Sequence, residues 1–351
     1  MEPSLIVSGG GDNAIRIWSV PKKLFTFKGV ENLRPVLEVL KFLSPEEVVG
    51  VARVSKQFYE ASFHSEVSKL IFEQTNVLEG HTGSVNSVAV SLKKGILVSA
   101  SDDSTIRVWS LATAQVTQVL KGHSDAVFSV AISSDGESVV SGSDDNTLRV
   151  WSLASGLTTL LLTGHSDVVS SAAISSKDQF IVSCSFDKTL RVWSLTTGEV
   201  IRVLQGHSNW VNSVAISKTD QYIVSGSFDN TVRVWSLASG DTIRVLRGHR
   251  CDIFSSVAIS SKDEFVIGGT GYALVKVWNL ASGQTIQELG GHLQCNSVSL
   301  SNDDKYLVSG DDEILLESED YFPLKVWDLT TGKKIQELQG HTGPAYALKL
   351  I

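Results

Sequence analysis

The sequence has few residues that could crosslink the chain or hold a metal ion. Its 351 residues include three cysteines, Cys184, Cys251 and Cys295, which show neither a paired spacing nor the spacing of metal ligands. Sparse, unpaired cysteine is typical of proteins in a reducing compartment. We therefore expect no disulfide framework, no metal site and no cofactor.

Positive charge and long apolar stretches are scarce as well. Lysine and arginine number 30 against 38 aspartates and glutamates, which gives a net charge of −8. Nucleic acids and anionic membrane surfaces favour a basic stripe or patch, so this balance argues against both partners. No run of 18 or more apolar residues is present, and the opening MEPSLIVSGG lacks the pattern of a signal peptide. We expect a protein of the cytoplasm or the nucleus.

What the sequence does contain is one phrase repeated along most of its length. Its clearest copy is GHSNWVNSVAISKTDQYIVSGSFDNTVRVW, residues 206–235, in which Gly-His precedes two alternating apolar runs, a polar turn and a closing tryptophan. The repeated histidines are His81, His123, His165, His207, His249, His292 and His341. The repeated tryptophans, at steps of 42, 42, 42, 43 and 49 residues, are Trp109, Trp151, Trp193, Trp235, Trp278 and Trp327. This period predicts propeller blades of four strands.

One further repeat is divided between the two ends of the sequence. His341 has no tryptophan after it, and Trp18 has no Gly-His before it. Joined end to end, the two are 28 residues apart, which is also the spacing from His207 to Trp235. We expect PAYALKL to supply the first strand of a seventh blade, and SLIVSGG and AIRIWSV to supply the next two. Such a blade closes the ring without a free end strand.

These repeats resemble the WD-repeat propeller family over about six-sevenths of the chain. The Trp-Asp pair of that family occurs once, as Trp327-Asp328, and other repeats have Trp-Ser or Trp-Asn. The expected fold class is all-β, a seven-bladed WD-repeat β-propeller with one blade split between the termini, plus a small all-α insertion. The expected domains are the N-terminal strands of the split blade (1–29), the insertion (30–75) and six blades with the closing strand (76–351).

The insertion interrupts the repeat after its first tryptophan. Residues 31–74 place apolar side chains at helical rather than alternating spacing. The SPEE sequence at 44–47 has the pattern of a helix start, with a capping serine and a proline at the first helical position. A small helical module is therefore expected here. Either flank of it, about 23–29 or about 75–80, is a candidate for the fourth strand of the split blade.

Part of the insertion, VLKFLSPEEVVGVARVSKQFYEAS at 39–62, resembles an F-box. The shared features are an aromatic-Leu pair closing one helix, an acidic turn with proline, an apolar helix, and a basic residue before an aromatic one. The usual opening Leu-Pro and late tryptophan are absent, and a generic helical insertion is the alternative. The resemblance implies docking to a ubiquitin ligase adaptor. The residues expected to face the adaptor or the core of the insertion are Val39, Leu40, Phe42, Leu43, Val48, Val51 and Val54.

Each regular repeat also contains a histidine, a serine, an aspartate and a tryptophan at constant spacing. A catalytic set would occur once, whereas this set recurs from blade to blade, so we interpret it as scaffold. In the WD-repeat family these residues form a hydrogen-bonded network that ties the loop entering a blade to its strands. The residues of the expected networks are His81, Asp103, Trp109, His123, Asp145, Trp151, His165, Asp187, Trp193, His207, Asp229 and Trp235, and in the split blade His341, Asp12 and Trp18.

The resemblance also implies which residues face a binding partner. In this family two positions on the first strand of each blade and one before the turn aspartate line one face of the ring. The candidates for this face are Asn86, Phe128, Phe186, Trp210, Asn212, Phe228 and Tyr346. Exposed aromatic residues are typical of binding hot spots. F-box receptors for phosphorylated peptides present arginines at these positions, and none is present here, so we expect an unphosphorylated or basic-apolar protein segment.

No motif for nucleotide binding, metal binding or nucleophilic catalysis is present, so we expect a non-catalytic protein-interaction module. Our first hypothesis is the substrate receptor of an SCF-type cullin ubiquitin ligase. In this hypothesis residues 31–72 bind the adaptor and the propeller binds the target protein. The alternative is a WD-repeat scaffold that assembles a multiprotein complex and has no ubiquitin role.

Overall fold

The computed structural model describes residues 5–19, 73–248, 253–271, 274–291, 294–311 and 322–351. The chain divides into two units. The first unit comprises Met1–Ser19 together with Gln74–Ile351, and the second comprises Val20–Glu73. Apart from Glu73, the second unit lies outside the described residues. The helical insertion and the seven residues expected to face an adaptor therefore fall outside them too.

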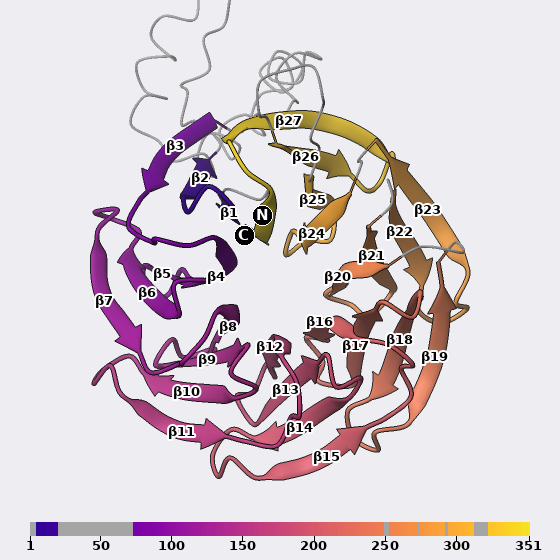
Figure 1. The fold of residues 1–351 in the computed structure, drawn as a ribbon. Coiled ribbons are helices and arrows are strands. Elements are labelled where there is room, and N and C mark those ends of the chain that lie inside the picture. Colours follow the sequence, from indigo (N-terminus) through magenta and orange to yellow (C-terminus); the bar gives the residue numbers. More distant parts are fainter. Residues whose placement is uncertain (1–4, 20–72, 249–252, 272–273, 292–293, 312–321) are drawn as a thin grey trace, which may run out of the picture. The chain divides into compact units, whose positions relative to one another are not determined.

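Within the described residues the first unit consists of seven four-stranded antiparallel sheets, or blades, arranged in a ring (Figure 1). Blades one to three comprise β4 (Val85–Ser91), β5 (Ile96–Ser101), β6 (Thr105–Ser110), β7 (Val116–Lys121); β8 (Val127–Ile132), β9 (Ser138–Ser143), β10 (Leu148–Ser152), β11 (Thr158–Leu162); and β12 (Val169–Ile174), β13 (Phe180–Ser185), β14 (Leu190–Ser194), β15 (Val200–Leu204). Blades four to six comprise β16 (Val211–Ile216), β17 (Tyr222–Ser227), β18 (Thr231–Ser236), β19 (Thr242–Arg247); β20 (Phe254–Ile259), β21 (Phe265–Thr270), β22 (Leu274–Asn279), β23 (Thr285–Gly290); and β24 (Cys295–Leu300), β25 (Tyr306–Asp311), β26 (Phe322–Asp328), β27 (Lys333–His341). The expected all-β propeller of seven blades is confirmed.

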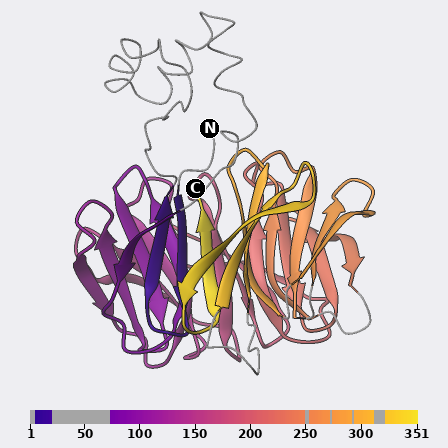
Figure 2. The ribbon, with the colours of Figure 1, turned by 90° about the horizontal axis from the view of Figure 1, so that it is seen from above.

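The seventh, split blade joins segments from both ends of the chain. Its strands in order are β28 (Ala345–Leu350), β1 (Leu5–Gly10), β2 (Ile15–Ser19) and β3 (Glu73–Leu78). The pairing of β28 with β1 is antiparallel and sets Ile6 opposite Leu350. Figure 2 shows the two ends of the ring lying next to each other. The ring is therefore closed by non-covalent pairing, as the spacing of the terminal histidine and tryptophan predicts.

The fourth strand of the split blade comes from the C-terminal side of the insertion. The sequence left two candidates, and β3 (Glu73–Leu78) occupies the place beside β2. The hydroxyl of Thr75 donates a hydrogen bond to the Ile17 carbonyl over 3.2 Å. Of the two candidates, the segment at about 75–80 therefore supplies most of this strand; the other, 23–29, lies outside the described residues.

The hydrophobic core lies between the blades. Blades alternate apolar side chains toward their two neighbours, so that apolar clusters form at the junctions between them. At the junction of blades three and four, Val192 and Leu204 pack with Val214, Ile223 and Trp235, all of them less than 8% exposed. Full burial of such a side chain is worth about 1.5–3 kcal/mol. Because such clusters lie at every junction from the split blade and blade one round to blades five and six, blades one to five are each stabilised by both of their neighbours.

Serines on the innermost strands join neighbouring blades around the central channel. The Ser213 hydroxyl accepts a hydrogen bond from the Val257 amide of the next blade over 3.1 Å, and Ser171 accepts one from Val214 over 3.3 Å. At the junction of the split blade with blade one, Ala347 stands at the equivalent position and has no hydroxyl. Bridges of this kind are also made by Ser87, Ser129, Ser256 and Ser299. Apart from Ser256 and Ser299, these serines stand in a Val-x-Ser phrase, but that phrase does not reveal that they bridge different blades.

Candidate functional site

Each regular blade fixes the loop before its innermost strand through a buried hydrogen-bond network. In blade four, Nδ1 of His207 donates to Asp229, Nε2 of His207 accepts from the Ser225 hydroxyl, and Nε1 of Trp235 donates to Ser225, each over 2.8 Å. The donor directions follow because a carboxylate only accepts and an indole only donates. The same three bonds, between 2.7 and 2.9 Å long, occur in blades one, two and three.

The network aspartates are charged but fully engaged inside their own blade. Burial by itself raises the pKa of Asp229, but hydrogen bonds from His207 and Thr231 outweigh it and lower the pKa. The pKa values of Asp145 and Asp187 are lowered for the same reasons. A carboxylate that already accepts bonds from a buried histidine and a threonine is not available to a substrate. This geometry supports the scaffold interpretation of the repeated residues.

The split blade contains a related network that joins the two ends of the chain. His341 contacts the Ser8 hydroxyl at 2.6 Å and the Asp12 carboxylate at 2.9 Å. Arg16 donates to Asp12 over 2.5 Å, and the Trp18 ring lies 6.0 Å from the His341 ring. Burial raises the pKa of Asp12, but the bond and charge of His341 outweigh it and hold the pKa at about 2.

Blade five departs from the common network. Gly268 stands where the other blades have the serine, and a side chain there would meet the ring of Phe254 at 2.8 Å. Phe254 in turn packs on Trp278 with the ring centroids 5.7 Å apart. Apolar packing thus takes the place of a hydroxyl in this blade. Tyr272 and Tyr321, which the sequence places at the aspartate positions of blades five and six, lie outside the described residues.

Three recurring arginines that could suggest a phosphate site are packed inside the blades. The guanidinium carbons of Arg149, Arg191 and Arg233 lie 5.9, 5.9 and 5.6 Å from the centroids of the tryptophan rings in their blades. A side chain added at Gly206 would meet Arg233 at 2.7 Å, so the Gly-His loop closes directly over it. These cations therefore contribute to packing rather than to an open anion-binding surface.

The networks position one side of the ring, which we call the top face. It is formed by the loops before the innermost strands and by the turns between the second and third strands. In blades one to five and in the split blade a backbone hydrogen bond joins the two, for example from Phe228 N to Trp210 O over 2.9 Å in blade four and from Asp144 N to Ala126 O over 2.9 Å in blade two. Residues at these positions consequently lie side by side, as the family resemblance implies.

An aromatic cluster lies on the top face at the junction of blades three and four. Trp210 stacks on Phe186 of the preceding blade, with centroids 4.7 Å apart and planes 13° apart. Phe228 meets the same indole edge-on at 5.5 Å. Trp210 remains 43% exposed, whereas Phe186 and Phe228 are half-buried. We call these three residues the aromatic cluster.

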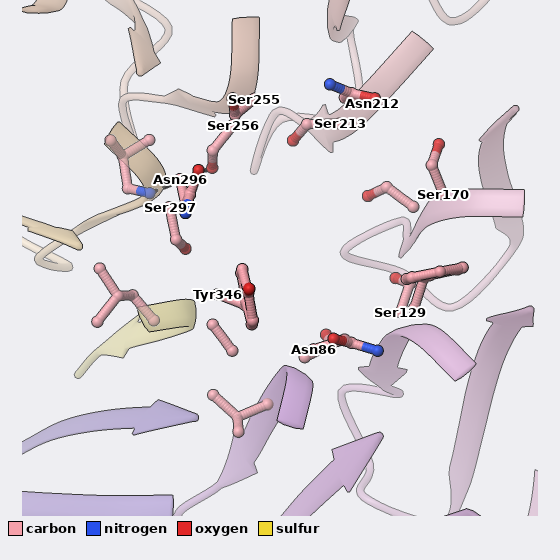
Figure 3. Close-up of a pocket in the computed structure, with 17 residues that line it drawn as sticks. Asn86, Ser129, Ser170, Asn212, Ser213, Ser255, Ser256, Asn296, Ser297 and Tyr346 are labelled. Carbon is pink, nitrogen blue, oxygen red and sulfur yellow. Dashed lines mark hydrogen bonds between the residues drawn. The ribbon is translucent and has the colours of Figure 1, made fainter. Parts of the chain in front are cut away.

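A cavity of about 180 Å³ opens at the centre of the ring, lined by the innermost strands (Figure 3). Its lining is uncharged and mostly hydroxyl and amide groups. Two of the amides are partly engaged, because Asn86 donates to the Val127 carbonyl at 3.2 Å and Asn212 to that of Phe254 at 3.5 Å. Pockets for small-molecule ligands are typically about 300 Å³ or larger. This cavity is therefore suited to a single inserted side chain rather than to a nucleotide or a cofactor.

Beside the aromatic cluster the top face is acidic. Asp102 and Asp144 hold in blades one and two the position that Phe186 and Phe228 hold in blades three and four. Partial burial, together with the charges of nearby aspartates, Asp125 first among them, raises the pKa of Asp144. The charges that raise this pKa are those of four other aspartates, Asp125, Asp167, Asp145 and Asp102, which indicates a concentration of negative charge at this place.

The structure brings the expected partner-binding residues into two groups. Asn86, Phe128, Asn212 and Tyr346 line the central cavity, whereas Phe186, Trp210 and Phe228 form the aromatic cluster. Of the five aromatic residues in this set, Trp210 and Tyr346 alone are exposed. Phe128, Phe186 and Phe228 are half-buried. Stacking against Trp210 explains the burial of the last two.

The described parts of the chain contain no group of three or more histidine, cysteine, aspartate and glutamate side chains arranged to hold a metal ion. Cys184 and Cys295 are buried and form no disulfide among the described residues, and Cys251 lies outside these residues. No helix among the described residues has the length and apolarity to cross a bilayer.

Comparison with known proteins places the repeats in one family. Six segments match the family model described as WD domain, G-beta repeat, and they cover 72–110, 114–152, 156–194, 198–236, 240–279 and 283–315. The two ends of the chain, which the structure joins in the split blade, lie outside these matches.

Two curated proteins are similar to parts of the chain. Transcription initiation factor TFIID subunit 5 of Drosophila melanogaster is 33% identical over 114 residues, which is 32% of this chain and 13% of that protein. WD repeat-containing protein 26 homolog of Arabidopsis thaliana is 34% identical over 101 residues, 28% of this chain and 16% of that protein. The chain thus spans a small part of the length of the relatives it matches.

Proposed function

The chain belongs to the WD-repeat family, and we propose that it is a non-catalytic scaffold that holds a partner protein on its top face. The observation that carries this proposal is the aromatic cluster. Trp210 is 43% exposed although two rings and a closed propeller are available to bury it. Large aromatic side chains held rigidly at a surface are typical of binding hot spots.

The central cavity supports the same surface. Asn212 lies two residues from Trp210 on the chain and lines the cavity, so that a segment lying across the cluster reaches the opening. Tyr346, which is 38% exposed, lines the opposite part of the cavity. We propose that the partner places one polar side chain in the cavity and an apolar one against Trp210.

Replacing Trp210 with alanine is expected to remove proteins that co-purify with the wild-type chain and to leave the fold intact. The exposed indole contributes little to the core, whereas loss of a central aromatic anchor costs about 2 kcal/mol or more of binding free energy. Affinity purification followed by mass spectrometry measures the loss. Leu157→Ala is the matched control, because Leu157 is 68% exposed and lies beside β11, an outermost strand. Retention of every partner by Trp210→Ala would contradict the proposal.

For the insertion we propose the finer role of a ubiquitin ligase receptor, on the resemblance of 39–62 to an F-box. The acidic turn at 44–47 and the apolar residues around it are the features that support this role. In this proposal the insertion binds the ligase adaptor and the top face presents the target. The name of the Drosophila relative, a transcription initiation factor subunit, makes the nucleus the location that we propose.

Leu40→Asp is expected to abolish adaptor binding, because it places a charge among the apolar residues proposed to face the adaptor. A pull-down with purified adaptor and wild-type, Leu40→Asp and Trp210→Ala chains tests this. Trp210→Ala is the control and is expected to bind the adaptor as the wild type does. If wild type does not bind, or Leu40→Asp binds equally well, the receptor role fails and the scaffold proposal stands unchanged.

A further inference from the structure

We infer that the top face of blades one to four selects a positively charged segment of the partner protein, with basic side chains over the acidic part and an apolar side chain on the aromatic cluster. This inference rests on the proposed scaffold function and adds the chemistry of the partner. It commits to a protein segment rather than to an anionic ligand.

The first support is the order of residues around the ring. The position before the turn aspartate is Asp102 in blade one, Asp144 in blade two, Phe186 in blade three and Phe228 in blade four. Two consecutive carboxylates are thus followed by two consecutive aromatic rings along one arc. Trp210 bridges the two rings. The arc therefore has a charged half and an apolar half that one extended segment can cover.

The second support is that the carboxylates of the charged half and its neighbours Asp125 and Asp167 form no ion pair with any cation in the described part of the chain. Among the ion pairs between described residues, none includes Asp102, Asp125, Asp144 or Asp167. Asp125 and Asp167 accept hydrogen bonds from the backbone amides that follow them, each over 2.8 Å. Asp102 accepts one from the Asn86 amide over 2.6 Å. These bonds orient the carboxylates without neutralising them.

The third support is electrostatic. Partial burial raises the pKa of Asp144, and Asp125, Asp167, Asp145 and Asp102 raise it further in that order. The folded state therefore places like charges together on this part of the top face. A cationic partner relieves this repulsion when it binds, and residues that cost stability but serve recognition are common at functional surfaces.

The same features argue against a phosphorylated or nucleic-acid partner. The recurring arginines of blades two to four are packed on tryptophan rings, as described above. The turns that carry the arc read DDST, DDNT, FDKT and FDNT, and contain one basic residue, Lys188. A phosphate brought to this arc meets several carboxylates and a single lysine, so it is repelled.

The test uses the full chain and two fluorescent peptides that differ in charge alone. One alternates lysine or arginine with leucine, and the other has glutamate at each basic position; both are measured by fluorescence anisotropy. We expect the basic peptide to bind and the glutamate peptide to bind at least about tenfold more weakly. Equal binding of the two peptides, or tighter binding of the glutamate or a phosphoserine peptide, would overturn the inference.

Variants separate this arc from general attraction to an acidic protein. The double variant Asp102→Asn with Asp144→Asn is expected to bind the basic peptide with roughly tenfold lower affinity. Its binding is also expected to depend less on salt concentration. Asp241→Asn, in the turn between β18 and β19, removes a charge of the same kind elsewhere and is expected to leave affinity unchanged. Asp144→Asn is also expected to raise the melting temperature, because it relieves the repulsion. Equal weakening by Asp241→Asn and by the double variant would show non-specific attraction and overturn the inference.

The outcome is distinguishable from failure of the scaffold function. Suppose that a cellular partner is lost with Trp210→Ala but still binds the double aspartate variant. This result would support the scaffold function and overturn the inference of a basic segment. Lys188→Asn serves as a further check, because it makes the blade-three turn identical to that of blade four. This variant is expected to bind the basic peptide with slightly higher affinity, and a lower affinity would count against the inference.

Discussion

Replacing His341 with alanine is expected to lower the free energy of unfolding by about 3 kcal/mol and to loosen β28 selectively. His341 is 2% exposed and contacts Ser8 at 2.6 Å, although the two residues are 333 positions apart. It also contacts Asp12 at 2.9 Å, which is a second link between the two ends of the chain. No turn connects β28 to β1, so non-covalent contacts hold the ring closed there, among them these side chains and the backbone pairing.

His207→Ala is the matched control in an internal blade. His207 makes the same two kinds of contact, at 2.8 Å to Asp229 and 2.8 Å to Ser225. A short turn nevertheless ties β16 covalently to β17, so the strand has a second means of staying in place. Urea denaturation measures the stability of both variants, and hydrogen exchange of Ala345–Leu350 measures the protection of the closing strand. Equal protection from hydrogen exchange for β28 in His341→Ala and β16 in His207→Ala would show that His341 has no special role in holding the closing strand.

Acidification is expected to destabilise the ring in two steps between about pH 7 and pH 2. The first step comes from histidines, because burial lowers the pKa values of His81 and His341 below the ordinary 6.5. A base with a lowered pKa in the folded state contributes stability above its unfolded pKa and loses it as the pH falls. The second, larger step comes from the network aspartates.

The aspartates also cause the free energy of unfolding to fall as the pH falls. The pKa of Asp12 lies at about 2 against an ordinary 3.8, and those of Asp145, Asp187 and Asp229 are also lowered. The folded state therefore binds fewer protons than the unfolded state near pH 3, and stability is lost as pH falls below about 4. With side chains less than a tenth exposed, each carboxylate contributes roughly 1–2 kcal/mol.

Urea midpoints measured at intervals from pH 7 to about pH 2 test this expectation. Asp229→Asn is the control variant, because it has one carboxylate fewer to titrate. It is expected to be less stable than wild type at pH 7 and to approach wild type at the acid end. A wild-type midpoint that does not change below pH 4 would show that these carboxylates do not stabilise the fold.

The sequence by itself determined those features that are confined to one repeat. The number of blades and the closure between termini follow from spacings, and the network of a blade follows from positions such as His207 and Asp229, 22 residues apart. Residues so close in sequence meet through short turns and paired strands, whose register fixes which side chains face each other. The closing pair, His341 and Asp12, was also predictable because it completes the same spacing.

Only the tertiary structure decided what happens between repeats. It placed Trp210 on Phe186 of the preceding blade, and Ser213 against the Val257 amide of the next. It also shows that β3 is the fourth strand of the split blade. Such contacts depend on how neighbouring blades are rotated and packed against each other. Since that geometry is set by the whole closed ring, no single repeat encodes it, and the candidate binding surface lies at just these junctions.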